Sequence, residues 1–532
     1  MPWVYYAIWL VLAVWPMVRH YFGGQKILAG GYLFWGLFSL FLIIFRYGSH
    51  VYDRSMDTLT PPLRVVSAVV MCATVLLCTL PMGMSPRHNG EMVDFHYQYE
   101  GLTEQIAEGQ LHLKQTPPEA LVAMENPYDF EARQALGLTY EWDTALYDGH
   151  YYVYFGVAPV VLLFLPYKLI TGRTLLSYHG TQLFTALFII GLFLLFHTIA
   201  KRFFPKTPYG IVLALSAAFS VMSVFFATGA PALYCTAITC GICFQVWSFY
   251  FHIRAVYLEN TYRAQTVCAV LGSVCGALVF ASRPPVGLAA FVSVPMLLYH
   301  IRRCRDERHM ETKLLVRQVL LAALPYVLVA IPLMCYNAAR FDNPFEFGQA
   351  YMLTNGDLTV CKNFAERFDI RMILDGIHTM LFRTEGFQDT FPYFRRSGVF
   401  ANFPVLLFLC ALVLPAVRQR LKERGLLYAV CAIPVVTLVM AAFETYWVTE
   451  IIERYRMDVY FLLGTGCFIT ALALLDAMKN RTLLCAVLGV LAVYTLVASF
   501  FLYLIPEDQN TAMMCEAFYY WTGWALSLGK AG

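Results

Sequence analysis

Long apolar stretches separated by short polar segments run through the chain from residue 3 to residue 504. A run of about 20 apolar residues is long enough to cross the hydrocarbon core of a bilayer as a helix. The alternating ten-residue segments of a membrane β-barrel are not visible. We therefore predict an all-α polytopic membrane protein with about 13 transmembrane helices, over residues 3–19, 27–45, 63–82, 178–200, 209–228, 232–253, 264–281, 286–301, 314–336, 400–417, 425–443, 457–477 and 482–504.

The apolar segment 151–170 decides the topology, because Gly156 and Pro159 weaken it as a simple span. If it does not cross and the amino terminus is cytoplasmic, almost every short basic cluster falls inside, as the positive-inside rule requires. We therefore predict an interfacial or re-entrant helix at the outer face. The inside clusters are then Arg46, Arg54 and Arg64; Lys201, Arg202 and Lys206; Arg254 and Arg263; Arg302, Arg303, Arg305, Arg308 and Lys313; Arg418, Arg420, Lys422 and Arg424; and Lys479 and Arg481.

A long segment that is both polar and aromatic, 83–177, interrupts the apolar pattern early. Such an excursion is more typical of a working part than of a connector, and we expect it to carry amphipathic and interfacial helices as an external, catalytic loop. The predicted regions are 1–82 (amino-terminal spans), 83–177 (first external loop), 178–336 (central bundle), 337–399 (second external loop), 400–504 (carboxy-terminal bundle) and 505–532 (external interfacial tail).

Composition supports the membrane class and narrows the functions. Of 532 residues, 59% are hydrophobic and 14% charged, and the mean hydropathy is +0.58. The net charge of +3 does not indicate a nucleic-acid partner, and the 15 cysteines lie mostly inside apolar runs, where they act as small hydrophobic residues. No nucleotide-binding motif is present, which argues against ATP-driven transport. The expected surroundings are membrane lipids.

Asp94 is the first candidate catalytic residue. It lies about a dozen residues after the third predicted span, at the start of a predicted amphipathic helix whose Glu100, Glu104 and Glu108 repeat every four residues as a wet face. A carboxylate there can deprotonate an acceptor hydroxyl, or hold a divalent cation (Mg²⁺ or Mn²⁺) that neutralises a departing phosphate. The structural alternative is an acid that stabilises the helix dipole.

Asp143 is the second candidate. It precedes Asp148-Gly149, a dipeptide typical of a turn, so Asp148 has a structural explanation that Asp143 lacks. His150 is a candidate proton carrier or ligand, with packing beside tyrosines as its alternative. Tyr152, in the aromatic run that follows, is a candidate substrate-binding residue.

Arginines on the predicted outer side are the second signal. Arg283 lies between two spans, and Arg454 and Arg456 begin another in "ERYRMD". Cations that oppose the topological bias need partners. These are either acids, with Glu450, Glu453 and Asp458 as candidates, or a lipid phosphate that the forked guanidinium binds.

Four features together resemble the GT-C superfamily of integral membrane glycosyltransferases. They are Asp94 soon after a membrane exit, the G-x-Y-Y-x-Y-F run followed by Pro159, the "PALY" of residues 231–234, and the late "ERYRMD". The relatives meant are polyprenyl-phosphate-sugar-dependent enzymes of the protein mannosyltransferase and aminoarabinose transferase types. The resemblance implies that Asp94 is a base or metal-associated carboxylate, and that Arg454 and Tyr455 lie near the donor phosphate. Many relatives carry an acid next to the interfacial helix. Here "YVYFGVAP" has none, so Asp143 or Asp148 would substitute.

The expectation is a membrane glycosyltransferase that moves a sugar from a polyprenyl-phosphate donor to a glycan, lipid or protein acceptor. The short loops indicate the cytoplasmic (inner) membrane of a bacterium, with the active site outside. The alternatives are a non-enzymatic flippase for lipid-linked glycans or a secondary transporter, and a structural subunit of an envelope complex. A transporter predicts ionisable residues deep inside the spans.

Overall fold

The structure is a computed structural model that describes residues 54–83, 97–307, 309–386, 395–448 and 451–505, with scattered residues between 7 and 18. Asp94, the predicted span 27–45 and most of the span 3–19 lie outside the described residues, as does the chain from residue 506 onward.

Ten helical segments in this part are long and apolar enough to cross a membrane, and each coincides with a predicted span. The predicted all-α polytopic class is confirmed. The segments are α3 (Pro61–Thr79, continued by the turn Leu80–Gly83), α8 (Ser177–Phe203), α9 (Tyr209–Gly229), α10 (Leu233–Ile253, continued by Arg254–Leu258), α11 (Tyr262–Ser282), α12 (Pro284–Gly287) leading through Leu288–Val292 into α13 (Ser293–Asp306), α14 (Thr312–Phe341), α19 (Leu427–Trp447), α20 (Glu453–Ala477) and α21 (Thr482–Tyr503).

The predicted span over 400–417 is broken into shorter helices. A short helix α17 (Val399–Asn402) is followed by a 3₁₀ helix (Pro404–Val413), and α18 (Pro415–Glu423) then turns away at 82°. Leu414 between them is extended, the conformation favoured before a proline, and Pro415 has no backbone N–H to continue the helix. The described part therefore has ten spans, or eleven if the bent pair counts as one, and the predicted total of 13 is not confirmed.

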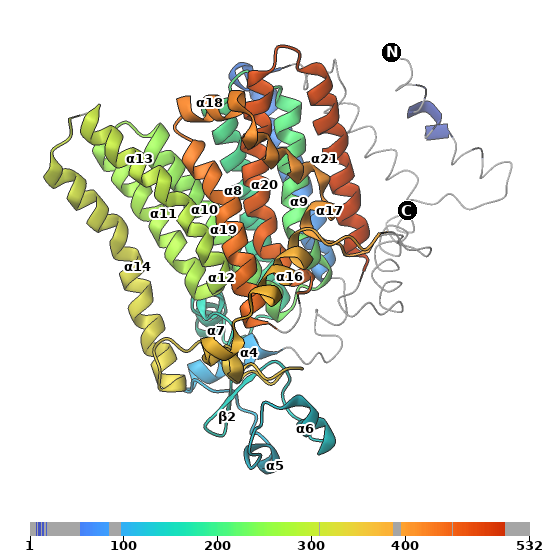
Figure 1. Cartoon of the computed structure of the whole chain (residues 1–532), viewed down its shortest axis with the longest axis vertical. Coiled ribbons are helices and arrows are strands. Elements are labelled where there is room, and N and C mark those ends of the chain that lie inside the picture. Colours follow the sequence, from blue (N-terminus) through green and yellow to red (C-terminus); the bar gives the residue numbers. More distant parts are fainter. Residues whose placement is uncertain are drawn as a thin grey trace.

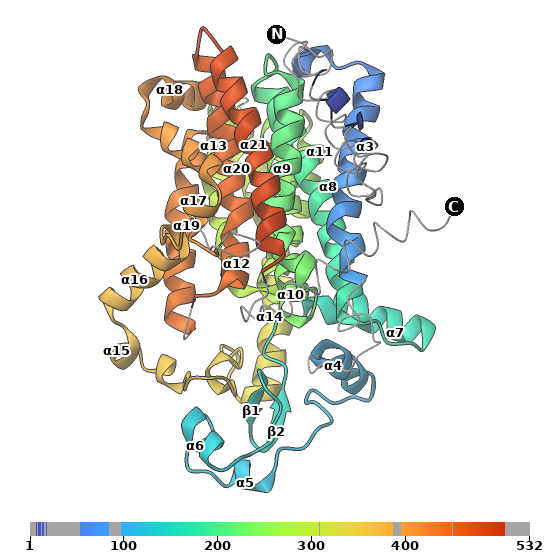
Figure 2. The same ribbon diagram turned by 90° about the vertical axis from the view of Figure 1, so that its right-hand side faces the viewer.

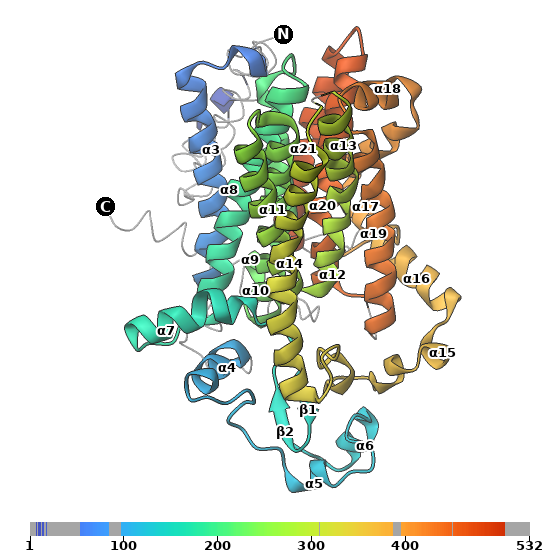
Figure 3. The ribbon, with the colours of Figure 1, turned by 90° about the vertical axis from the view of Figure 1, so that its left-hand side faces the viewer.

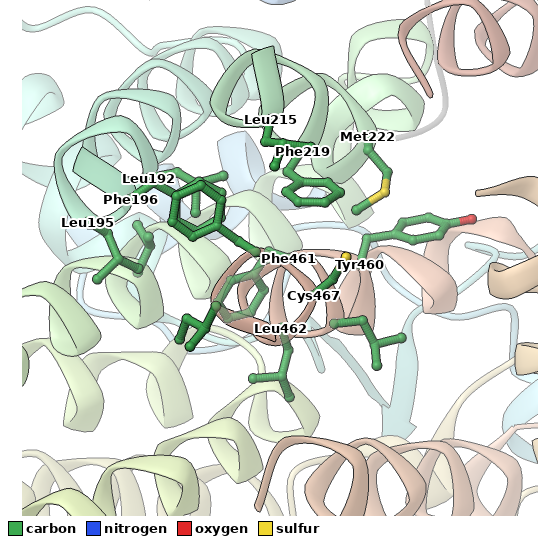
Figure 4. Packing of buried hydrophobic residues seen from close by; sticks show 14 of the residues in the cluster. Leu192, Leu195, Phe196, Leu215, Phe219, Met222, Tyr460, Phe461, Leu462 and Cys467 are labelled. Carbon is green, nitrogen blue, oxygen red and sulfur yellow. The ribbon is translucent and has the colours of Figure 1, made fainter. Parts of the chain in front are cut away.

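Two helices, α9 and α20, form the centre of the bundle. Nearly all of their apolar residues are buried, whereas α14 stands at the edge with almost none buried. Figure 4 shows the face of α20 around Phe461 packed against Phe196 of α8 and Phe219 of α9. The rings of Phe196 and Phe468 stack with centroids 4.0 Å apart. Close packing of this kind holds helices together in lipid, where the hydrophobic effect between helices is weak.

The loops divide between two ends of the bundle (Figures 1 and 2). At one end, which we call the basic end, the short loops contact one another directly. Arg424 contacts both Asp476 (2.7 Å) and the Phe203 carbonyl (2.7 Å), and the Tyr257 hydroxyl donates to the Gly425 carbonyl. The other end, which we call the loop end, carries residues 97–176, 342–386 and 395–398. This division places the predicted short basic loops on one side and the described parts of both large loops on the other.

The first large loop folds into small elements (Figure 3). The described part begins with α4 (Gln98–Ala107), α5 (Glu119–Val122) and α6 (Phe130–Ala135). Strands β1 (Ala145–Tyr147) and β2 (His150–Tyr152) then form an antiparallel hairpin in which Ala145 pairs with Tyr152. Asp148 and Gly149 both have positive φ (45° and 71°), as a tight two-residue hairpin loop requires. The predicted turn at Asp148-Gly149 is confirmed.

The ambiguous segment 151–170 contains a short helix, Val160–Thr171, made of a π-helical turn (Val160–Phe164) and α7 (Leu165–Thr171). Twelve residues span about 18 Å, well short of the roughly 30 Å hydrocarbon core. Leu169 and Ile170 are 69% and 83% exposed. The hairpin before it and the start of α8 after it lie at the same end of the bundle (Figure 2). The segment therefore returns without crossing, as predicted.

The second large loop lies beside the first. Its described elements are short helices at Gln349–Tyr351 and Thr359–Lys362, then α15 (Phe364–Arg367) and α16 (Ile370–Leu381). A bridge between Ala145 and Met352 adds this loop to the edge of the hairpin. The two loops therefore form one layer at the loop end.

Candidate active site at the loop end

Asp143 is a buried carboxylate between the hairpin and the bundle. Its backbone has a φ of 52°, the left-handed region that aspartate tolerates better than most residues. Its N–H donates to the Leu353 carbonyl (3.1 Å), and its own carbonyl accepts from the Gln98 side chain (3.0 Å). These bonds fix the backbone between both large loops, and the carboxylate points to Tyr234, whose hydroxyl donates to it.

Tyr234 connects Asp143 to a cation. It lies in the first turn of α10, so the "PALY" segment delivers its ring to the loop end. The Arg454 guanidinium lies over this ring at 3.9 Å from the centroid, and 5.5 Å from the ring of Tyr455. A cation at this distance from an aromatic face is attracted by the ring quadrupole. Asp143, Tyr234 and Arg454 thus form a continuous chain of contacts from the first loop to the start of α20.

A second charged group lies at the same end. Arg283, between α11 and α12, contacts both carboxylate oxygens of Asp458 through Nε (2.9 and 2.8 Å). Its Nη2 atom is 2.8 Å from Asp458 and 3.4 Å from Glu444. All three side chains are largely buried, so three helices, α11, α19 and α20, are held together by one cation. The Arg283 guanidinium also lies 5.7 Å from the ring of Tyr455, next to Arg454.

The segment 153–156 fastens the hairpin to this helix end. A Cβ on Gly156 would lie 2.1 Å from the Ser282 carbonyl oxygen, so only glycine permits this approach to the end of α11. The Tyr99 hydroxyl donates to the Gly156 carbonyl (3.1 Å), and Arg340 donates to the Val153 carbonyl (2.6 Å). The loop layer is therefore fixed to the bundle beside Arg283.

Tyr154 shows how close these groups are. Burial raises the pKa of its phenol well above the usual range, and the charge of Asp143 raises it further, while Arg454 acts in the opposite direction. The Tyr154 ring packs against Phe155 at 3.9 Å, and Phe155 packs edge-on against Tyr234 at 5.3 Å. Tyr154 and Phe155, from the aromatic run of the first loop, therefore pack beside the Asp143–Tyr234–Arg454 chain of contacts.

The other predicted site residues lie in different surroundings. Arg456 is buried in an ion pair with Glu453 (2.8 Å), which also accepts from the Tyr460 hydroxyl (2.5 Å). His150 is exposed on the hairpin with its ring stacked on His112 at 4.3 Å. The structure brings Arg283, Arg454 and Tyr455 together and joins Asp143 to them through Tyr234.

Tyr152 packs against Phe341 (5.4 Å) rather than against this chain of contacts. Asp148 occupies the hairpin turn. Asp94 lies outside the described residues and stays a prediction. For Arg283 and Arg456, the structure supplies the acidic partners that the sequence offered as an alternative to phosphate.

Glu100 was predicted to be on a wet helix face, and this is wrong. It is buried, and it accepts from both the backbone N–H and the hydroxyl of Ser177, with hydroxyl distances of 2.8 and 2.9 Å. Burial raises the pKa of the Glu100 carboxyl from 4.5 to about 7, while the Ser177 hydrogen bonds act against that rise. The bonds cap the first turn of α8, where the helix dipole favours an acid. Glu104 and Glu108 are exposed, as predicted.

A divalent cation has no ready-made site among the described residues. They contain no group of three or more His, Cys, Asp or Glu side chains placed to hold a metal ion. Of the buried acids here, Asp458 and Glu444 face Arg283, and Asp143 accepts from Tyr234. These carboxylates already have partners, so they do not fit a metal centre by themselves.

Comparison with known proteins gives partial likeness to solved structures. No family model and no curated protein matches the sequence. The archaeal oligosaccharyltransferase AglB from Archaeoglobus fulgidus, in complex with an inhibitory peptide and a dolichol-phosphate, matches at 13% identity and a TM-score of 0.45 over 84% of this chain. ArnT from Cupriavidus metallidurans, bound to undecaprenyl phosphate, matches at 12% identity and a TM-score of 0.42, over 86% of this chain and 78% of that one.

A second structure of the Archaeoglobus oligosaccharyltransferase, tethered to an acceptor peptide, matches at 12% identity with a TM-score of 0.45. The chain spans only 56% and 55% of the two oligosaccharyltransferase chains. Likeness at this level carries neither a family nor an activity to this chain.

Proposed function

We propose that the protein is a membrane glycosyltransferase that moves a sugar from a polyprenyl-phosphate donor to a glycan, lipid or protein acceptor. One observation carries the proposal: the buried carboxylate of Asp143 and the guanidinium of Arg454 meet on the same tyrosine, Tyr234. Glycosyl transfer needs these two kinds of group close together. A carboxylate removes the proton of the incoming acceptor, and a cation stabilises the charge that develops on the departing phosphate.

The depth of the charges supports an enzyme over a transporter. Asp458 is the sixth residue of α20 and Glu444 lies three residues before the end of α19. At 1.5 Å per residue both are within about 8 Å of their helix ends, whereas the middle of a bilayer lies about 15 Å deep. A transport site is expected near the midplane. A transferase that takes an oily donor from the bilayer instead needs its polar groups at the membrane surface.

The proposal places the loop end on the outside of a bacterial inner membrane. Lys201, Arg202 and Lys206 lie with Arg424 and Arg481 at the basic end, where Arg481 donates to the Lys206 carbonyl. Short loops rich in lysine and arginine stay in the cytoplasm. The loop end, with Asp143 and Arg454, then faces the opposite compartment. A lipid-linked sugar can serve as the donor there without a nucleotide.

The residues have separate roles in this scheme. Arg454, with Tyr455 beside it, binds the donor phosphate. Asp143 acts as a base or orients the acceptor, and Asp94 supplies the other acid. Arg283 keeps α11, α19 and α20 in register through Asp458 and Glu444, so it positions the phosphate-binding arginine.

The test uses the purified full chain in proteoliposomes that contain undecaprenyl-phosphate-linked sugars, with a bacterial membrane extract as acceptor. Release of free undecaprenyl phosphate measures turnover. Asp143→Asn should lower turnover about 100-fold or more, the usual contribution of a general base, while binding of undecaprenyl phosphate, followed by native mass spectrometry, stays unchanged.

Arg454→Ala should weaken that binding about tenfold or more, because charge-assisted hydrogen bonds to phosphate are lost. Arg173→Ala removes an exposed arginine at the same end of the bundle and serves as the matched control. A native chain that releases no undecaprenyl phosphate would not be this transferase. Full turnover and lipid binding by Asp143→Asn and Arg454→Ala would show that these two residues do not have the proposed roles.

A further inference from the structure

Three aromatic rings gather on the first loop next to Asp143. Trp142 is 39% exposed, and its ring meets Phe130 of α6 edge-on at 5.8 Å and Tyr140 at 6.2 Å. Phe130 and Tyr140 are half-buried, so all three present part of their surface to the outside. We name this group the aromatic platform (Phe130, Tyr140 and Trp142).

A buried arginine holds the platform from below. Arg133 is completely buried and donates to the carbonyls of Pro127 and Thr354, so it joins the first large loop to the second. Its guanidinium lies 4.9 Å from the Tyr140 ring and 5.8 Å from the Phe130 ring. The cation occupies the inner side of these rings and fixes them. A rigid set of exposed rings binds a ligand without the entropy cost of ordering flexible side chains.

The platform is tied to Asp143 through the backbone. Trp142 directly precedes Asp143, and the amide of Gln98 donates to the carbonyls of both residues (3.3 and 3.0 Å). The carboxylate turns inward to Tyr234 while the indole stays exposed. A ligand on the platform therefore lies next to the acid, at a separation that Gln98 holds constant.

The surroundings of the platform favour a water-soluble ligand. Helices α5 and α6 lie at the tip of the loop end, beyond α7 and farthest from the spans (Figures 2 and 3). Aromatic side chains that anchor a protein in the head-group layer belong closer to the spans. Lipid chains are therefore an unsuitable occupant for rings held at this level.

The size and charge of the platform distinguish a sugar from a protein partner. Three partly exposed rings offer on the order of 200 Å², far below the roughly 800 Å² that each side of a stable protein interface buries. Acids surround the rings: Glu141 is half-exposed between Tyr140 and Trp142, and Asp129, which caps α6, and Glu131 within α6 are exposed. The flat C–H face of a pyranose packs on an aromatic ring, and carboxylates accept hydrogen bonds from its hydroxyls.

We propose that the aromatic platform, with Glu141, is the acceptor subsite and that it binds a carbohydrate chain. This inference rests on the proposed function, because only a transferase has an acceptor. It narrows the acceptor from a glycan, lipid or protein to a glycan. Binding of carbohydrate itself does not depend on transfer, so the two can fail separately.

The test is binding of the full-length protein, purified in nanodiscs and fluorescently labelled, to an array of defined oligosaccharides without any lipid donor. We expect the native chain to bind at least one class of glycan. Trp142→Ala should weaken that binding about tenfold, the loss of one stacked ring, and Trp142→Phe should restore most of it. Phe345→Ala removes a ring that is 74% exposed elsewhere at the loop end and should bind like the native chain.

Two results would overturn the proposal: no binding to any glycan by a folded native chain, or binding that Trp142→Ala leaves unchanged. Asp143→Asn separates the two proposals, because it should bind the array normally and yet fail in transfer. If the native chain releases no undecaprenyl phosphate while Trp142→Ala loses array binding, the carbohydrate site stands and the transferase does not. Binding of a protein partner in place of glycans would also count against the platform as a sugar site.

Discussion

Arg283 is a single cation that two carboxylates hold inside the bundle. Its contacts to Asp458 and Glu444 are the contacts between buried charges that join α11, α19 and α20 at the loop end. Removing one member of a buried ion pair costs more stability than replacing the whole pair with apolar residues. The remaining charge has then lost both its water and its partner.

Arg283→Met should therefore lower the free energy of unfolding by about 3–5 kcal/mol, measured by SDS titration of the purified protein. Arg305→Met is the matched control, since Arg305 is exposed and pairs with the neighbouring Asp306 at the basic end. It should cause no measurable loss. Equal effects of the two substitutions would show that the buried pairs contribute nothing.

Glu100 predicts a dependence of stability on pH. Burial raises its pKa from 4.5 to about 7 in the folded chain, so between these values the folded state binds more protons than the unfolded state. Stability from this group is complete below pH 4.5 and is lost as pH rises to 7. Glu100→Gln should flatten that part of the profile, followed as melting temperature from pH 5 to 8. Glu108→Gln changes an exposed acid at the end of the same helix and should leave the slope as it is. An unchanged slope in Glu100→Gln would contradict the burial.

Single residues show what the sequence could and could not predict about the site. Asp143 was identified because, unlike Asp148, it has no turn to explain it, and Arg454 because it opposes the topological bias. Both signals are visible locally. Tyr234, which joins the two residues, ends the "PALY" segment noted for the resemblance, but nothing in that segment indicates that its ring contacts both groups. The two acids that contact Arg283, Glu444 and Asp458, lie 161 and 175 residues further along the chain. Glu100 was misplaced because the four-residue repeat defines a face but does not say what α8 brings against it.

At the scale of elements, the approach of segment 153–156 to the end of α11 is the tightest constraint on the loop layer. A Cβ at Gly156 would lie 2.1 and 2.4 Å from two carbonyl oxygens, of Ser282 and Ala281, which belong to the helix backbone and cannot rotate away. Any side chain there must push the hairpin away from Arg283.

Gly156→Ala should destabilise the fold by about 1–3 kcal/mol, as overpacking does, and should weaken undecaprenyl phosphate binding as well. Gly489→Ala provides a control of opposite sign. Nothing lies within 4 Å of its Cβ position in α21, so it should stabilise by about 0.5–1 kcal/mol. The comparison uses melting temperatures of both variants, and a harmless Gly156→Ala would mean that the two segments are not in contact.

Hydropathy predicted the membrane-spanning helices correctly where the length of the apolar run is enough to identify them. In a bilayer, an apolar run of 20 residues has few alternatives to a helix. The exception at 400–417 had its cause in the sequence, since Pro404 and Pro415 stand near the two ends of the apolar run. Its composition passes for a span, but two prolines without N–H groups cannot support a single straight helix. The short helix Val160–Thr171 was correctly predicted not to cross. The prediction came from the charges of the other loops and not from the composition of the helix itself.

For the whole molecule, the expected orientation can be tested directly. Gln134→Cys on α6 and Lys479→Cys between α20 and α21 place exposed thiols at the two ends of the bundle. In intact bacterial cells, a membrane-impermeant maleimide should label the cysteine at 134, and should label the one at 479 only after permeabilisation. The parent chain corrects for native cysteines. The reverse pattern would put the loop end in the cytoplasm.

The distance along the chain between Arg283 and its partners also matters while the protein is being made. Glu444 leaves the ribosome 161 residues after Arg283, and Asp458 follows 175 residues after it. At 5–20 residues per second, this is roughly 8 to 32 s. Throughout that interval the arginine waits at the edge of the nascent bundle with neither acid yet synthesised. Insertion of the helices up to α11 must therefore tolerate a cation that only α19 and α20 can neutralise.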